Sequence, residues 1–326
     1  MKKNIYKINV KNCDRGCRLD KIITQNVRQI SRSYSKFLII NSRVIVNSMI
    51  NKNCSYKVGN KDNIVLYFIA KSRKIIPTLL FFDIIYEDND MAIINKPLNL
   101  PTHPNTIFDN KKTVVNTLIL YFYTLSNIRG NHRPGIIHRL DKNTSGIMII
   151  AKNNNVHFDL NNQMLNKGIK KVYYAVIYRV PVPVMYIVTT NIDICKHNRT
   201  KMEVVTDDQG KIAITHYKVI RTYENKNFSL VECYLNTGRT HQIRLHMQYK
   251  NTPIICDFKY TIHFSFSLYS SISLKLIFQE IKILNRYALH SKELELIHPY
   301  TCKRLTFSLP VENSVYCFLS ILRKDF

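Results

Sequence analysis

The stretch HRLDKNTSGIM, residues 138–148, places one carboxylate between two cations, directly before an apolar segment. Its single acidic residue is Asp141, flanked by Arg139 and Lys142. Because nearby positive charge favours the ionised form of a carboxyl group, we expect Asp141 to be charged at neutral pH. An aspartate beside an arginine is most often a surface ion pair or a turn residue, so its chemistry alone leaves that simpler reading open.

The overall charge of the chain points to a polyanionic partner. Its 326 residues include 48 Lys plus Arg against 22 Asp plus Glu, which gives a net charge of +26 at pH 7. Such an excess is typical of nucleic-acid-binding proteins, because Lys and Arg displace counterions from phosphates. A lysine-rich composition, in a chain also rich in Asn and Ile, explains part of the excess but not the scarcity of acidic residues.

Length and cysteine usage indicate the general class of protein. A chain of 326 residues with 45% hydrophobic content predicts about two globular domains. The 8 cysteines are scattered without a Cys-x-x-Cys pair, as is typical of a reducing compartment. We see no apolar signal peptide at the N-terminus, and the longest apolar run, 261–278, is interrupted by His263, Lys275 and serines. The sequence therefore predicts a cytoplasmic protein without membrane contact.

The first part of the chain predicts a small domain over residues 15–70. Apolar residues recur at helical spacing from Leu19 to Val27, and short apolar strands follow around turns at 47–53 and 59–60. The frame formed by Arg18–Lys21, Val44–Asn47 and Tyr56–Gly59 resembles the S4 RNA-binding domain.

This resemblance implies phosphate contacts from Arg18, Arg32, Lys36 and Arg43; a solvated basic face is the alternative. Relatives usually carry Gly before the Val-x-Val-Asn strand, where this chain has Ser42 and Arg43. A turn with positive φ would be strained there.

A linker is expected at 71–80, where charged residues precede Pro77, and one larger domain at 81–326. Several of its expected strands follow one another without an intervening helix, so we expect an α+β domain with a mixed, mostly antiparallel sheet. The expected strands are 84–86, 91–94, 147–151, 172–180, 186–194, 213–221, 228–235, 287–296 and 305–309. The expected helices are 113–125, 154–166, 240–249 and 315–323.

The segment His138–Gly146 resembles the catalytic motif of the RluA family of RNA pseudouridine synthases. Four further segments match that family in the expected order, 86–97, 171–175, 237–246 and 288–299. The resemblance covers residues 15 to 310 and implies a pseudouridine synthase catalytic domain behind the S4-like domain. Within the family, the chain looks most like the RluC branch, which acts on the large-subunit rRNA.

The resemblance also implies the roles of the site residues. Asp141 would be the catalytic carboxylate, which attacks either C1′ of the ribose or C6 of the uracil. Tyr173 would stack on the target base or accept a proton, and the alternative is an ordinary core tyrosine. Arg244 would pair with Asp141. Arg239 is the second candidate for that pairing, and otherwise a phosphate contact.

The target uridine must leave its stack to be reached, so RNA contacts are expected around the site. Arg139 would either fill the vacated space or contact a phosphate, and Lys142 and His241 complete the expected RNA-binding set. His241 and His246 lack an evident third ligand, so no metal is expected. The chain has no Gly-rich phosphate loop, so no nucleotide cofactor is expected either.

We therefore expect an enzyme without cofactors that isomerises specific uridines of RNA as a monomer. The expected substrate is bacterial 23S rRNA, free or in a precursor of the large ribosomal subunit. A non-catalytic RNA-binding or ribosome-assembly protein on the same fold is one alternative, and an RNA N-glycoside hydrolase is another. The segment 261–283 departs from the family, because it is apolar and serine-rich where relatives carry a charged loop.

Overall fold

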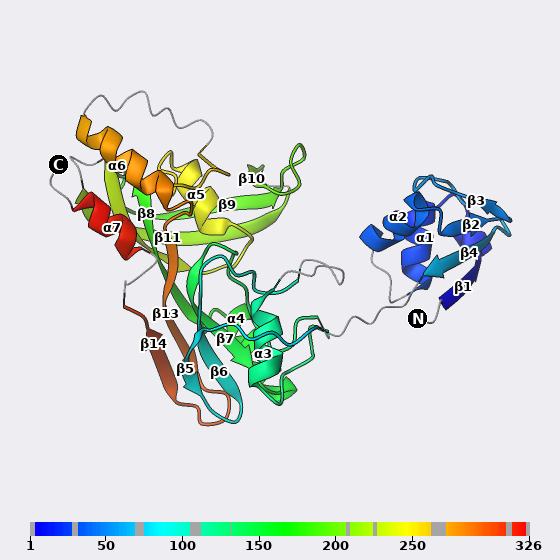
Figure 1. Cartoon of the computed structure of the whole chain (residues 1–326), viewed down its shortest axis with the longest axis horizontal. Coiled ribbons are helices and arrows are strands. Elements are labelled where there is room, and N and C mark those ends of the chain that lie inside the picture. Colours follow the sequence, from blue (N-terminus) through cyan, green and yellow to red (C-terminus); the bar gives the residue numbers. More distant parts are fainter. Residues whose placement is uncertain are drawn as a thin grey trace. The chain divides into compact units, whose positions relative to one another are not determined.

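The chain forms two compact units, Met1–Arg73 and Lys74–Phe326 (Figure 1). The structure, a computed structural model, describes residues 4–27, 32–68, 75–104, 112–130, 132–206, 209–223, 227–261, 272–310 and 315–323. Residues 71–74 of the expected linker lie outside these ranges. Among the described helices, none combines the length and the apolar character that a membrane crossing needs.

The first unit pairs two helices with a four-stranded antiparallel sheet of order β1-β4-β2-β3. The helices are α1 Leu19–Asn26 and α2 Arg32–Ile40, and a 3-10 helix, η1, covers Asn12–Asp14. The strands are β1 Asn4–Asn9, β2 Val44–Val46, β3 Met49–Ile50 and β4 Asn63–Phe68. Because Leu19, Ile22 and Ile23 recur at helical spacing, α1 buries them together in the core of this unit.

The first unit contains one strand that the sequence did not predict and one turn that it did. The expected start at residue 15 leaves out β1, which pairs with β4 along its whole length. That strand is weak in the sequence because Ile8 is its buried apolar side chain, while Ile5 is 57% exposed. Ser42 has a φ of +58°, so the strained turn expected before β2 is present.

The second unit is built on a mixed, mostly antiparallel sheet, which confirms the expected α+β class. Its order is β10-β9-β11-β12-β8-β13-β7-β6-β5, with β14 paired to β13. Only β7 and β13 pair in parallel among the described strands. The strands are β5 Asp83–Glu87, β6 Met91–Lys96, β7 Ser145–Ala151, β8 Lys170–Tyr178, β9 Met185–Ile194, β10 Met202–Val205, β11 Lys211–Tyr223, β12 Phe228–Leu235, β13 Leu289–Ile297 and β14 Arg304–Ser308.

Both faces of the central strands are covered, because successive residues of a strand point to opposite sides. On β6, Ala92 and Ile94 join the larger core, which also contains side chains of α3, α5, α6 and α7. Met91 and Ile93 of the same strand join a second core under α4. The helices are α3 Val114–Tyr121, α4 Asn154–Leu165, α5 Gln242–Tyr249, α6 Ile272–Ile283 and α7 Tyr316–Leu322 (Figure 1).

Two elements of this unit were not expected. Helix α6 occupies the second part of the segment 261–283, whose residues 262–271 lie outside the described ranges. Strand β10 is four residues long and only half-buried, so it leaves no alternation strong enough to recognise.

The parallel pairing of β7 and β13 holds the first residues of β7 in place. Gly146 has a φ of +112°, and a Cβ atom there would lie 2.2 Å from the carbonyl oxygen of Ser291. Only glycine allows the two backbones to approach so closely. The preceding turn, which carries Asp141, is therefore held against β13.

Candidate active site

Asp141 lies in the turn that leads into β7. The amide of Thr144 donates to the carbonyl oxygen of Asp141 at 3.1 Å and closes this turn. On the preceding residue, Thr102 Oγ1 donates to the carbonyl oxygen of Leu140 at 2.8 Å and accepts from the amide of Leu140 at 3.3 Å. Hydrogen bonds at Asp141 and at the residue before it thus hold the backbone that carries the carboxylate.

The side chain of a buried lysine also supports this turn. Lys96 is fully buried, and its Nζ donates to the carbonyl oxygens of Pro97 at 2.7 Å, Leu100 at 2.9 Å and Lys142 at 3.3 Å. Burial lowers the pKa of Lys96 to about 7, although the charge of Asp141 opposes this shift. From the sequence, Lys96 marked only the end of a strand; nothing there shows that its amine joins two loops.

Arg244, on α5, joins Asp141 to a second carboxylate. Its Nη1 donates to Asp141 Oδ2 at 3.0 Å. Its Nε and Nη2 donate to the two oxygens of Asp257 at 2.7 and 2.8 Å. A planar guanidinium held in this bidentate way has its remaining donor fixed in direction. The sequence predicted the pairing of Arg244 with Asp141 but missed Asp257.

Two tyrosine rings enclose the guanidinium of Arg244. Its Cζ lies 4.3 Å from the ring centre of Tyr287 and 5.1 Å from that of Tyr260. The hydroxyl of Tyr287 also donates to Asp141 Oδ2 at 3.5 Å and shares a hydrogen bond of 3.2 Å with Thr144. Tyr287 directly precedes the family-like segment 288–299, but no spacing rule predicts that the two tyrosines meet here.

Electrostatics keep Asp141 ionised. Burial alone would raise the pKa of this carboxyl group, but the charges of His241 and Arg244 and the hydrogen bond from Arg244 hold it below its usual value. Burial lowers the pKa of His241 to about 4, so the ring is neutral at neutral pH. Arg244 therefore supplies the lasting positive charge, since its own pKa is raised by Asp257 despite burial.

A cavity of about 740 Å³ opens beside Asp141. Tyr173 and Arg244 line it with Asp141, so the three residues predicted as catalytic meet in one place. The predicted RNA contacts Arg139, Arg239 and His241 also line it. Lys142 does not line the cavity; its side chain is exposed, and only its carbonyl oxygen supports the turn.

Tyr173 and His241 present different groups to this cavity. Tyr173 lies on β8 and is 6% exposed, and burial raises the pKa of its phenol to about 12. His241 caps α5 with a φ of +55°, so it is not part of the helix, as the expected helix 240–249 would require. Its Nε2 lies 3.7 Å from Asp141 Oδ2, and its Nδ1 shares a hydrogen bond of 2.7 Å with the hydroxyl of Tyr260.

In the first unit, three of the four predicted phosphate contacts gather around one buried carboxylate. Arg18 and Arg32 donate to Asp20 at 3.0 and 3.2 Å, and Lys36 Nζ lies 3.9 Å away. The side chains of Arg32 and Lys36 stay 56% and 42% exposed. Arg43 is exposed on the chain before β2 and does not join this group.

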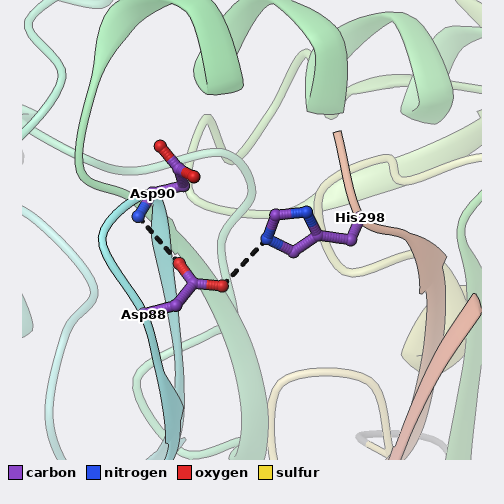
Figure 2. A group of neighbouring side chains, drawn as sticks. All are labelled: Asp88, Asp90 and His298. Carbon is purple, nitrogen blue, oxygen red and sulfur yellow. Dashed lines mark hydrogen bonds and ion pairs between the residues drawn. The ribbon is translucent and has the colours of Figure 1, made fainter. Parts of the chain in front are cut away.

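One cluster of the second unit has the composition of a metal site, Asp88, Asp90 and His298 (Figure 2). Asp88 Oδ2 accepts hydrogen bonds from Tyr86 at 2.6 Å and from His298 Nε2 at 2.8 Å. Nδ1 of His298 accepts from the amides of residues 300 and 301, so Nε2 carries the proton and has no lone pair for a metal. The cluster therefore joins the β5–β6 turn to the end of β13.

His246 is likewise occupied. Its two ring nitrogens bond the hydroxyls of Thr190 at 3.0 Å and Thr215 at 2.9 Å, in a fully buried setting. It therefore cannot join His241 as a ligand pair.

Comparison with known proteins gives consistent matches. The family model described as RNA pseudouridylate synthase matches residues 90–249. The ribosomal large subunit pseudouridine synthase D of Blochmanniella floridana is 34% identical over 314 residues, covering 95% of each chain. The protein of that name from Neisseria meningitidis serogroup B is 34% identical over 95% of this chain and 80% of its own. The uncharacterized RNA pseudouridine synthase YlyB of Bacillus subtilis is 33% identical over 94% and 95%.

Solved structures show the same fold at lower identity. Human RNA Pseudouridylate Synthase Domain Containing 4 superposes with a TM-score of 0.56 at 24% identity, over 74% of this chain and 94% of that chain. Human RNA Pseudouridylate Synthase Domain Containing 1 gives 0.52 at 19% identity, over 71% and 83%. The residues matched by the family model include Asp141, Tyr173 and Arg244.

Proposed function

Because this chain belongs to the RluA family of RNA pseudouridine synthases, we propose that it converts uridines of large-subunit ribosomal RNA to pseudouridine with Asp141 as the catalytic carboxylate. The enzyme class follows from the family, whereas the roles of single residues are our inference. One observation carries this inference: Asp141 faces a cavity that also contains Tyr173, and Arg244 holds it ionised.

The reaction breaks the bond between ribose C1′ and uracil N1 and forms a bond between C1′ and C5. The hydrogen on C5 leaves as a proton, and N1 gains one, so no oxidant, metal or cofactor enters the balance. Asp141 is an anion that can attack and later leave, which divides one difficult exchange into two easier steps. Attack at C1′ of the ribose and attack at C6 of the uracil both fit this requirement.

The detached uracil must be held while it turns. Tyr173 presents a buried ring to the cavity, which supports the role of stacking platform. Because the pKa of its phenol is about 12, Tyr173 stays protonated at neutral pH and is poorly suited to the role of base. Water must be kept from the sugar during this step, because its attack there would yield hydrolysis.

The rim of the cavity is cationic. Arg139 and Arg239 are exposed there, and Arg239 Nε is held by the carbonyl oxygen of Ile212 at 2.9 Å. Because Arg244 pairs with Asp141, we assign Arg239 to phosphate contact. Arg139 fits both of its proposed roles, the filling of the space left by the flipped uridine and phosphate binding.

The names of relatives support a substrate for this enzyme. Relatives from two bacteria carry the name ribosomal large subunit pseudouridine synthase D, which supports 23S rRNA, free or in a precursor particle, as substrate. The similarity to the RluC branch stays a prediction, since these relatives bear another name. We propose an S4-like RNA-binding domain at 15–70, a linker at 71–80 and the catalytic domain at 81–326, acting as a cytoplasmic monomer.

Tritium release tests the proposed function directly. Large-subunit rRNA transcribed with uridine tritiated at C5 is incubated with the protein, and tritium in the water is counted. Isomerisation must expel that hydrogen, so we expect release from the native protein and none from Asp141→Asn. Chromatography of the same reaction shows whether free uracil appears.

Each alternative gives its own result in this assay. A non-catalytic RNA-binding or ribosome-assembly protein would bind the rRNA without tritium release. An N-glycoside hydrolase would yield free uracil and leave the C5 hydrogen in place. Either result would overturn the proposed function.

A further inference from the structure

The cavity beside Asp141 extends beyond the reacting uridine, toward helix α4. Its lining includes Phe158, Asn161 and Leu165, which lie at positions i, i+3 and i+7 of that helix. The opposite face of α4 is buried, since Val156 and Leu160 pack in the core below. α4 therefore turns one fixed face toward the cavity.

Two side chains on this face are unusually apolar for an exposed surface. Phe158 is 62% exposed and Leu165 is 79% exposed, although both lie on a well-formed helix beside a basic cavity. Single exposed apolar residues are ordinary, but an exposed ring that lines a cavity offers a flat contact. Such a ring costs little entropy to order, because it has two rotatable bonds.

Cations border the part of the cavity that lies beside α4. Arg129 Nη2 donates to Asn161 Oδ1 at 3.0 Å, so its guanidinium is held beside α4. Lys171 also lines the cavity and is 9% exposed, and within the described part of the chain no carboxylate lies in ion-pair distance of it. A mostly buried amine without a carboxylate partner suits a phosphate. Positive charge interleaved with an exposed ring is the pattern of a single-stranded nucleic-acid site.

We propose that the groove between α4 and the Asp141 cavity binds the single-stranded RNA next to the target uridine, with one unpaired base stacked on Phe158. This inference rests on the proposed function, because it takes the flipped uridine to occupy the Asp141 cavity. Phe158 is then a substrate-binding residue that does not touch the reacting atoms. It favours uridines whose neighbouring base is unpaired and free to stack, without base-edge hydrogen bonds.

Steady-state tritium release separates stacking from chemistry. Stacking of one base on an aromatic ring corresponds to roughly 5- to 100-fold in affinity. We expect Phe158→Ala to raise KM by about that factor with kcat retained, because the ring acts only in binding. Phe158→Tyr keeps the ring and should restore KM. Tyr123→Ala is the matched control, since Tyr123 is a fully exposed aromatic outside the groove.

Filter binding of the same rRNA, run alongside, keeps the two proposals distinguishable. Suppose that the native protein releases no tritium, while Phe158→Ala loses RNA binding and Phe158→Tyr regains it. The proposed function is then refuted, and the RNA-binding role of the groove is supported. If tritium release is normal and Phe158→Ala leaves KM and binding unchanged, the groove is refuted and the function stands. The stacking role is also overturned if Phe158→Ala lowers kcat without raising KM. It is overturned equally if Phe158→Tyr loses as much RNA binding as Phe158→Ala.

Discussion

At the scale of single residues, the site depends on one cation shared by two carboxylates. Arg244 is buried, and its three nitrogen donors are divided between Asp257 and Asp141. Without Asp257 the guanidinium would lose two of these three directional hydrogen bonds. The direction of its bond to Asp141 therefore depends on a residue that need not touch substrate. Asp257 is thus a positioning residue for the Asp141 carboxylate.

Replacing Asp257 by asparagine tests this dependence. An amide keeps one acceptor but presents an NH₂ group to the guanidinium, so we expect Arg244 to lose its bidentate hold. The loss of a charged, buried hydrogen bond predicts a fall in kcat of roughly 10- to 100-fold. The exposed Asp193→Asn is the matched control and should leave kcat unchanged. Native kcat in Asp257→Asn would refute the positioning role.

The pH profile follows from the same contacts. Because the pKa of Asp141 is lowered, its active ionised form persists as pH falls and is lost only below the ordinary carboxyl value of 3.8. The pKa of His241 is about 4, so its ring also does not titrate near neutrality. We therefore expect kcat/KM measured by tritium release to show no acid limb between about pH 7 and about pH 5. A limb centred near pH 6 would contradict the pKa given for Asp141 or the pKa given for His241.

At the scale of elements, the parallel contact of β7 with β13 locates the Asp141 turn. This contact is between strands that are distant in the sequence, and it is short, His290 with Ser145 and Ser291 with Gly146. The sequence predicted both strands, but a register between distant strands leaves no local trace. Only the identity of Gly146 hints at the close approach.

Gly146→Ala should therefore destabilise the second unit strongly. The added Cβ would meet the Ser291 carbonyl at 2.2 Å, in a backbone conformation that alanine rarely adopts. We expect a loss of at least about 3 kcal/mol in the free energy of unfolding, measured by urea denaturation. Gly168→Ala is the control: its Cβ would meet Gln163 O at 3.4 Å, so its effect should stay within about 1 kcal/mol. Equal midpoints for the two variants would contradict the close approach.

The elements that the sequence did reveal are those with a strong local signal. The β5–β6 hairpin follows from two apolar runs on either side of a polar turn. The helix α4 was also predicted, and in the structure the side chain of Asn153 accepts from the amide of Val156 at its start. β10 has no buried face, and α6 lies in a segment without a family counterpart, so neither could be recognised. In the same way, Asp141 and Arg244 lie in long motifs, whereas Asp257 and Tyr287 acquire their roles only through tertiary contacts.

At the scale of the whole molecule, the net charge of +26 is the property most relevant to RNA. Length and composition predicted two domains and a polyanionic partner without any motif. Part of this charge is concentrated in the first unit, where Arg18, Arg32 and Lys36 surround the single carboxylate of Asp20. These cations outnumber their partner, so the group keeps excess positive charge for phosphates.

The salt dependence of RNA binding measures that contribution. Each phosphate contact adds roughly 0.7 to 0.9 to the slope of log Kd against log salt concentration. We expect the double variant Arg32→Gln, Lys36→Gln to lower this slope by about 1.5, while Arg18 still balances Asp20. The control Lys170→Gln, Arg304→Gln removes the same charge from residues paired with Glu293 and Glu295. Equal slopes in the two double variants would exclude a phosphate-binding role for Arg32 and Lys36.

The central claim, that Asp141 of this chain makes pseudouridine in large-subunit rRNA, is tested most directly by mapping pseudouridine positions in that RNA. Unmodified rRNA is treated with the native protein or with Asp141→Asn, and every modified position is read. We predict pseudouridine at a few discrete positions after treatment with the native protein and at none after treatment with the variant, although both bind the RNA. Modification by Asp141→Asn at the native level, or none by the native protein, would contradict the account.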